Sequence, residues 1–106
     1  MDVINLTKDN FQSQIDHGVT LVDFWSTWET QLPIIGELAT EYKHRAVIAK
    51  LNVDEEKEIA AEYKVTSIPT VMVFKDGYMV ESMVGPQTGE TLRQKINLYI
   101  ALGETC

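Results

Sequence analysis

Apolar runs of strand length alternate along this chain with segments in which apolar residues recur at helical spacing. The runs predict buried strands, and the helical spacing predicts helices that pack one face against a core. The expected strands cover residues 3–6, 19–25, 46–53, 70–75 and 78–84. The expected helices cover a segment after Thr7 that stops near Gly18, and residues 30–42, 55–63 and 90–102.

Local residue types mark the ends of some of these elements. Thr7 and Asp54 are of the kind that caps helix N-termini, so we expect them to cap the first and third helices. Asp76 and Gly77 separate two strand-like runs and favour a type I′ turn, which needs positive φ at both positions. The last two strands should therefore pair as an antiparallel hairpin.

The order of the predicted elements indicates the fold class. Strands alternate with helices up to a terminal hairpin, which favours an α/β protein with a mixed sheet and helices on both of its faces. No Gly/Ser-rich or Pro-rich linker, repeat or low-complexity segment interrupts the pattern. We therefore expect residues 1–106 to form a single domain.

Charge and composition argue against several classes of partner and cofactor. The chain has 9 Lys and Arg residues against 16 Asp and Glu residues and a formal charge of -7, so nucleic acid and anionic membranes are not expected partners. The N-terminus lacks the pattern of a leader, and no apolar stretch is long enough to span a bilayer, so we expect a cytoplasmic protein. The one cysteine, Cys106, allows neither an intrachain disulfide nor a cysteine-rich metal site, and we expect no metal and no cofactor.

Several local motifs, in their order and spacing, resemble the thioredoxin family. They are Val22-Asp23-Phe24-Trp25, Trp28, Ala49-Lys50-Leu51-Asn52-Val53-Asp54, Ser67-Ile68-Pro69-Thr70, Phe74-Lys75-Asp76-Gly77 and Val84-Gly85. The resemblance implies a thioredoxin fold, in which a central five-stranded mixed sheet is flanked by four helices in three layers. It also implies the family role of dithiol-disulfide oxidoreductase in cell redox homeostasis, with an active site at the start of the second helix.

The chain departs from the family pattern at that active site. The family reads W-C-G-P-C-x-x-x-x-P, whereas this chain reads Trp28-Glu29-Thr30-Gln31-Leu32-Pro33. Because the flanking residues stay in register on both sides, we interpret the difference as a clean excision of four residues. In the family, one cysteine attacks a substrate disulfide as a thiolate and the second cysteine releases it. Both sulfurs are missing here, so we expect no such activity.

Two charged residues match the surroundings of the missing cysteines. Asp23 lies in a predicted buried strand and matches a carboxylate that serves the second cysteine as acid or base. We expect Lys50 to lie near it. Without a thiol to serve, both residues are interpreted as vestigial, and a buried Asp23 requires water or Lys50 to satisfy its charge.

A peptide-binding groove is a further feature that the resemblance implies. Ile68 and Pro69 match a loop with a cis proline that faces the active site and offers backbone hydrogen bonds to an extended chain, so we expect Pro69 to be cis. Trp28, Gly85 and Pro86 match the other walls of this groove. An X-Pro bond that closes a turn needs no function, so peptide binding and a purely structural role both stay open.

The remaining candidate residues have simpler interpretations. His17 and His44 are isolated in the sequence and lie next to predicted helix ends, where a histidine complements the helix dipole, so we expect solvated side chains. Residues 55–58, Glu-Glu-Lys-Glu, read as the solvated first turn of a helix rather than a metal site. Trp25 is expected to contribute to core packing.

The excision also affects the second helix and the oligomeric state. An extended residue reaches further than a helical one, so we expect residues 29–32 to form a linker and Pro33 to be the first helical residue. A connection too short for its native turn also favours the exchange of elements between two chains. Both a monomer and a domain-swapped dimer are therefore expected states.

Two functions are consistent with the sequence. The first is a loop-deleted thioredoxin scaffold that is redox-inactive, because the family's enzymatic role requires the missing cysteines. The alternative is a redox-independent module that binds a protein or peptide partner through the groove with the cis proline.

Overall fold

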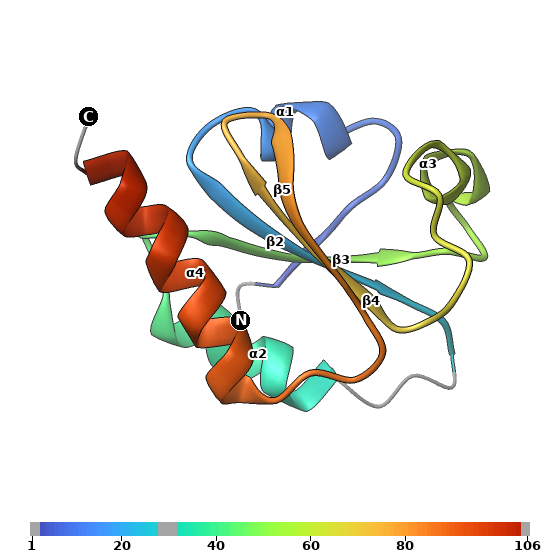
Figure 1. The fold of residues 1–106 in the computed structure, drawn as a ribbon. Coiled ribbons are helices and arrows are strands. Elements are labelled where there is room, and N and C mark those ends of the chain that lie inside the picture. The colour runs from blue at the N-terminus through green and yellow to red at the C-terminus, as the bar shows by residue number, and fades with distance from the viewer. Residues whose placement is uncertain (1–2, 28–31, 105–106) are drawn as a thin grey trace.

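The computed structural model describes residues 3–27 and 32–104. The elements follow the order β1 (Ile4–Asn5), α1 (Phe11–Ile15), β2 (Val19–Trp25), α2 (Leu32–Glu41), β3 (Val47–Asn52), α3 (Lys57–Glu62), β4 (Thr70–Lys75), β5 (Tyr78–Val84) and α4 (Gly89–Glu104). The strands form one sheet in the order β1-β3-β2-β4-β5, parallel from β1 to β2 and antiparallel from β2 to β5. Helices α2 and α4 cover one face, and α1 and α3 cover the other (Figure 1). The predicted α/β architecture is confirmed.

Side chains alternate along the buried strands and fill two separate cores. The core beneath α2 and α4 consists of Val19, Leu21, Ile35, Leu38, Ala39, Tyr42, Ile48, Val71, Val73, Leu92 and Ile96. The core beneath α1 and α3 consists of Leu6, Phe11, Ile15, Val22, Phe24, Ala49, Leu51, Ile59, Met72 and Phe74. Strand β2 contributes to both cores, so its position in the middle of the sheet fixes the three-layer arrangement.

Helix α4 packs on the sheet as its apolar spacing predicts. Leu92 and Ile96, one turn apart, are completely buried. The Thr91 N–H donates to Thr88 Oγ1 at 3.1 Å, so Thr88 acts as an N-cap and the helix begins one residue before its predicted start. None of the helices among the described residues is long and apolar enough to cross a membrane.

Asp54 does not cap α3, so that prediction is wrong. Asp54 Oδ2 accepts a hydrogen bond at 2.7 Å from Oγ of Ser26, a buried residue that follows β2. The N-cap position of α3 belongs to Glu56, which makes no side-chain cap. Because Asp54 is held toward the end of β2, residues 53–55 form a turn and α3 begins at Lys57, two residues later than predicted.

The first helix also starts differently from the prediction. Asn10 occupies the N-cap position of α1, so Thr7 is not the residue that caps it. The Phe11 N–H instead donates to the Thr7 carbonyl at 2.9 Å, which closes a turn before the helix. Helix α1 ends at Ile15, because residues 16–18 bend directly into β2.

The second helix begins close to its expected start. Helix α2 begins at Leu32, one residue before the predicted Pro33. The predicted linker covers residues 29–32, and the prediction is wrong for its last residue, because Leu32 already belongs to the helix. Residues 29–31 lie outside the described residues. The apolar positions that predicted this helix do lie on its buried face, since Ile35 and Leu38 are completely buried.

The hairpin between β4 and β5 has the predicted turn. Asp76 and Gly77 have φ values of 50° and 92°, as a type I′ turn requires. The turn is tied to the connection between α1 and β2, because the Gly18 N–H donates to Asp76 Oδ1 at 2.7 Å and the Gly77 N–H donates to the Ile15 carbonyl at 2.9 Å. The hydrogen bond from Gly18, together with Lys75, holds the pKa of Asp76 below its usual value.

The positive φ of Gly77 makes this turn sensitive to a β-carbon. Gly77→Ala should lower the free energy of unfolding by about 1–2 kcal/mol, because a Cβ in the left-handed region crowds the backbone. Gly36 in α2 is the matched control: a Cβ there would meet open space, and Gly36→Ala should raise the free energy of unfolding by up to about 1 kcal/mol. Urea unfolding measures both changes. Equal effects of the two substitutions would contradict this account.

The hydrogen bond between Ser26 and Asp54 joins the end of β2 to the segment after β3. Ser26→Ala should lower the free energy of unfolding by about 1–2 kcal/mol, because a hydrogen bond to a carboxylate is lost. Ser13 is the control, since it is exposed and its Oγ donates only to the Asn10 carbonyl at 3.1 Å. Ser13→Ala should change the same quantity by less than about 0.5 kcal/mol. A Ser26 variant as stable as the parent would show that the bond contributes nothing.

Candidate functional site

The charged residues that match the family's site lie on one face of the sheet, below α2 and α4. Asp23 is completely buried, and it lies two residues after Leu21, whose side chain belongs to the core on that face. Lys50 lies two residues after Ile48, which belongs to the same core. Asp23 and Lys50 are register partners across β2 and β3, so the sheet places the two residues side by side.

Trp25 completes this group at the carboxyl end of β2. The Lys50 ammonium lies 5.3 Å from the centroid of the Trp25 ring, a distance typical of a cation–π contact. The Trp25 Nε1–H is buried and has no hydrogen-bond partner in the part of the chain that the structure describes. The tryptophan thus packs at the edge of the core, and the Lys50 ammonium against its ring belongs to the residue paired with Asp23 in the sheet.

The predicted groove residues Pro69 and Gly85 are in direct contact. The Ile68–Pro69 bond is cis, as predicted, and the Gly85 N–H donates to the Pro69 carbonyl at 2.8 Å. Ile68, Pro69 and Gly85 are half-buried, and Pro86 is exposed. The start of β4 and the end of β5 therefore hold these residues together. Trp28, the fifth predicted groove residue, lies outside the described residues.

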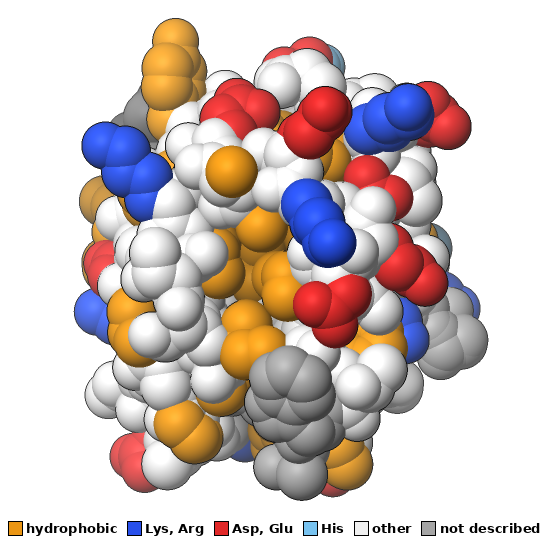
Figure 2. All heavy atoms as spheres, turned by 90° about the vertical axis from the view of Figure 1, so that its right-hand side faces the viewer, with side chains coloured by type: hydrophobic (Ala, Val, Ile, Leu, Met, Phe, Trp, Pro, Cys, Tyr) orange, Lys and Arg blue, Asp and Glu red, His pale blue; other side chains and the backbone are white. Residues whose placement is uncertain are grey.

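An apolar surface lies on the face of the molecule at the right-hand side of Figure 1. Figure 2 shows hydrophobic side chains gathered in a band down the middle of this face, with charged side chains beside it. Val84, which precedes the groove residue Gly85, is 67% exposed. An exposed apolar side chain next to the groove gives this site a surface that a peptide could cover.

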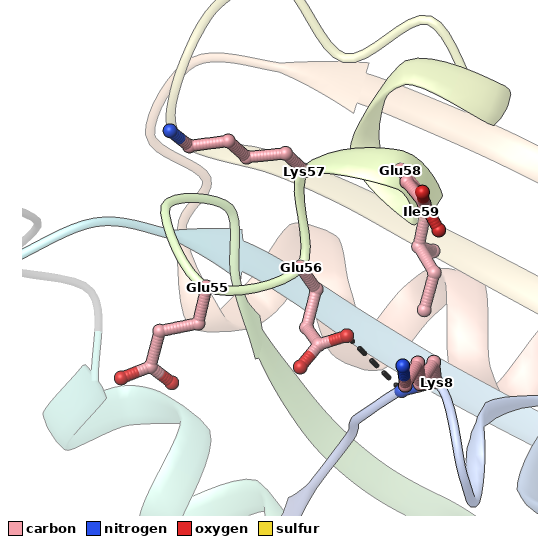
Figure 3. A pocket seen from close by; sticks show the side chains of 6 residues that line it. All are labelled: Lys8, Glu55, Glu56, Lys57, Glu58 and Ile59. Carbon is pink, nitrogen blue, oxygen red and sulfur yellow. Dashed lines mark hydrogen bonds between the residues drawn. The ribbon is translucent and has the colours of Figure 1, made fainter.

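A separate hollow of about 300 Å³ lies beside the start of α3 and is lined by Lys8 and residues 55–59. Glu56 Oε1 accepts a hydrogen bond from the Lys8 backbone N–H at 3.1 Å, and the Lys57 side chain points away from that pair (Figure 3). Glu55, Lys57 and Glu58 are exposed, as expected for solvated residues. Across residues 3–27 and 32–104, no group of three or more His, Cys, Asp or Glu side chains is placed to hold a metal ion.

Sequence reasoning missed two residues next to the site. Ser26 has no periodic neighbours, and its partner Asp54 lies 28 residues away, so only the parallel pairing of β2 with β3 could have indicated their contact. Val84 lies in the predicted strand and in the motif Val84-Gly85, but it is not among the predicted groove residues. Val84 lies at the end of the edge strand β5 and next to a glycine, and this position indicates that its side chain is exposed.

Comparisons with known proteins agree with this geometry. The family model described as Thioredoxin matches residues 2–98. Thioredoxins from the Mu50 and MW2 strains of Staphylococcus aureus are each 42% identical over 104 residues, which cover 94% of this chain and 100% of the relative. A solved mutant thioredoxin from Halobacterium salinarum is similar with a TM-score of 0.84 and 28% identity, over 93% of this chain and 91% of that chain. The order of the elements, the cis-proline loop and these similarities together show that the chain belongs to the thioredoxin family.

Proposed function

We propose that this chain is a thioredoxin scaffold that carries out no dithiol-disulfide exchange. The observation that carries the proposal is the cysteine count, because Cys106 is the only cysteine of the chain. Exchange of the family's kind needs one thiolate to attack a disulfide and a second thiol to release the enzyme. The disulfide oxidoreductase role is typical of the family, and in this chain both sulfurs of the motif are missing. The cytoplasmic location and the choice between monomer and swapped dimer stay predictions.

The alignment with the bacterial relatives supports the view that this chain lacks a short segment that the relatives have. The alignment covers 104 positions and the whole of each relative, but only 94% of the 106 residues here, which is about 100 residues. The relatives thus carry about four positions that have no counterpart in this chain, as expected for the loss of a four-residue motif.

The surroundings of the motif support descent from an active enzyme. Asp23 is completely buried and Lys50, its register partner, is half-buried on the same face below α2. Burial of a carboxylate costs desolvation energy, so a buried Asp23 is weak evidence of a stabilising role. The cis bond before Pro69 and its contact with Gly85 are present as well. These features fit a site whose thiol chemistry was removed while its framework remained.

Restoring the motif tests this proposal directly. Insertion of Cys-Gly-Pro-Cys between Trp28 and Glu29 should produce catalysed reduction of insulin disulfides by dithiothreitol, whereas the parent chain should not exceed the uncatalysed rate. The matched control is an insertion of Ser-Gly-Pro-Ser, which restores the length but supplies no thiol. It should remain inactive.

Two results would contradict the proposal. Activity of the parent that persists in a Cys106→Ser variant would show a different redox chemistry. A folded insertion variant that forms a reducible cysteine pair, yet reduces no substrate, would show that the retained residues do not form a working site. Near- and far-ultraviolet circular dichroism and thiol titration confirm the fold and the cysteine pair.

A second candidate function is redox-independent binding of an extended peptide. It is favoured by the exposed apolar side chain of Val84, which lies next to the joined Pro69 and Gly85. Pro69 and Gly85 carry no thiol themselves. A peptide laid along them would cover exposed apolar surface without any cysteine.

Variants of the groove test this second candidate. Peptides selected from a random phage-displayed library on the immobilised chain should lose at least about tenfold in affinity on Val84→Asp, because a charge would be buried under the peptide. Tyr78→Asp is the control, since Tyr78 is 77% exposed at the opposite end of the same strand and should leave the affinity unchanged. Fluorescence anisotropy measures both. Selected peptides that bind the two variants equally would contradict a groove site.

A further inference from the structure

A second hollow lies at the end of the sheet opposite the groove. It has a volume of about 310 Å³ and is lined by residues 17–19 and 44–47. Strands β2 and β3 begin at Val19 and Val47 and run parallel, so the two segments that precede them meet at this end. The groove residues belong to the other end, where the start of β4 pairs with the end of β2.

Basic side chains gather around this hollow. Arg45 and both histidines of the chain, His17 and His44, line it, and all three are exposed. The chain as a whole has a formal charge of -7, so a group of basic side chains departs from its general character. We propose that the hollow binds a small phosphate-bearing anion, with Arg45 as the main contact and the two histidines as supporting donors. This site is independent of the thioredoxin groove.

The orientation of Arg45 suits this role. Its guanidinium carbon lies 5.4 Å from the centroid of the Tyr42 ring, so one face of the group is held against an aromatic side chain. A guanidinium in such a contact keeps the N–H donors along its edge, and these match the spacing of phosphate oxygens. The volume is at the small end of the range for ligand pockets, which fits a phosphate group rather than a large cofactor.

The backbone at His44 provides an independent observation. Its φ is 69°, in the left-handed region that favours glycine, and it lies just after α2 where helices commonly end on glycine. Side chains in such sparsely populated conformations concentrate at functional sites. The chain thus has His44, and not the glycine that this backbone conformation prefers, at a position that lines the hollow.

Two acidic side chains compete with an anion for this site. The Asp16 carboxylate lies 3.8 Å from His17 Nδ1, and the Asp76 carboxylate accepts a hydrogen bond at 2.7 Å from the N–H of Gly18, which lines the hollow. Asp16 and Asp76 are 52% and 61% exposed, so water and salt screen both carboxylates. We therefore assign the leading contact to Arg45.

Titration with inorganic phosphate tests the proposal. The probe is added to ¹⁵N-labelled protein at pH 6.0 and constant ionic strength, and amide shifts are followed by NMR. We expect saturable shifts at Gly18, His44 and Arg45 with a dissociation constant in the millimolar range. Arg45→Gln should weaken binding about tenfold, and His44→Gly should weaken it less. Lys57→Gln changes the charge equally in the hollow beside α3 and should leave binding unchanged.

Several outcomes would overturn the inference. One is that the shifts fail to saturate, or are equal in the Arg45 and Lys57 variants. Either result would show that phosphate acts through the general charge of the protein and is not bound in the hollow. Equal shifts on titration with chloride in place of phosphate would do the same. Saturable shifts with Zn²⁺ but not with phosphate would make the hollow a metal site. None of these results bears on disulfide reductase activity or on peptide binding in the groove.

Discussion

The fold depends on strand β2, which is hydrogen-bonded on both sides and buried on both faces. It pairs in parallel with β3 and antiparallel with β4, and its neighbouring side chains Leu21 and Val22 enter different cores. Helices must therefore cover both faces, because no face of this strand can be left to water. The same pairing decides where chemistry can occur. The carboxyl ends of β2 and β3 collect Asp23, Trp25 and Lys50, and the amino ends bring His17 and His44 into one hollow.

The strands could be predicted from the sequence better than the helix ends. Strands β2, β4 and β5 have the predicted bounds, because apolar runs and the turn dipeptide are local features. The start of α3 could not be predicted in this way. Asp54 has the chemistry of a cap, but Ser26 competes for its carboxylate across the sheet, and only the pairing of β2 with β3 creates that competition. Local propensity thus fails where a distant partner offers a better hydrogen bond.

The candidate site was predicted through resemblance rather than through composition. Asp23, Lys50, Pro69 and Gly85 carry no periodic signal of a site, and their proximity depends on strand register and on one hydrogen bond between two loops. The two histidines show the opposite case. They are isolated in the sequence and exposed to solvent, as predicted, yet each precedes a strand by a few residues. Parallel pairing of those two strands is enough to bring them together, so a topological argument could have found this hollow.

The structure also separates what holds this fold together from what its family's chemistry requires. Among the residues that the structure describes, the buried hydrophobic residues of both cores lie before Trp25 or after Ile34. Within this described part of the chain, both cores of the family's fold are present without either cysteine of the family's motif. The family's activity has a different basis from its fold, because thiol exchange depends on cysteine sulfurs and not on the side chains that fill the two cores. Family membership follows from the cores and the strand order, whereas the dithiol chemistry typical of the family depends on two cysteine side chains.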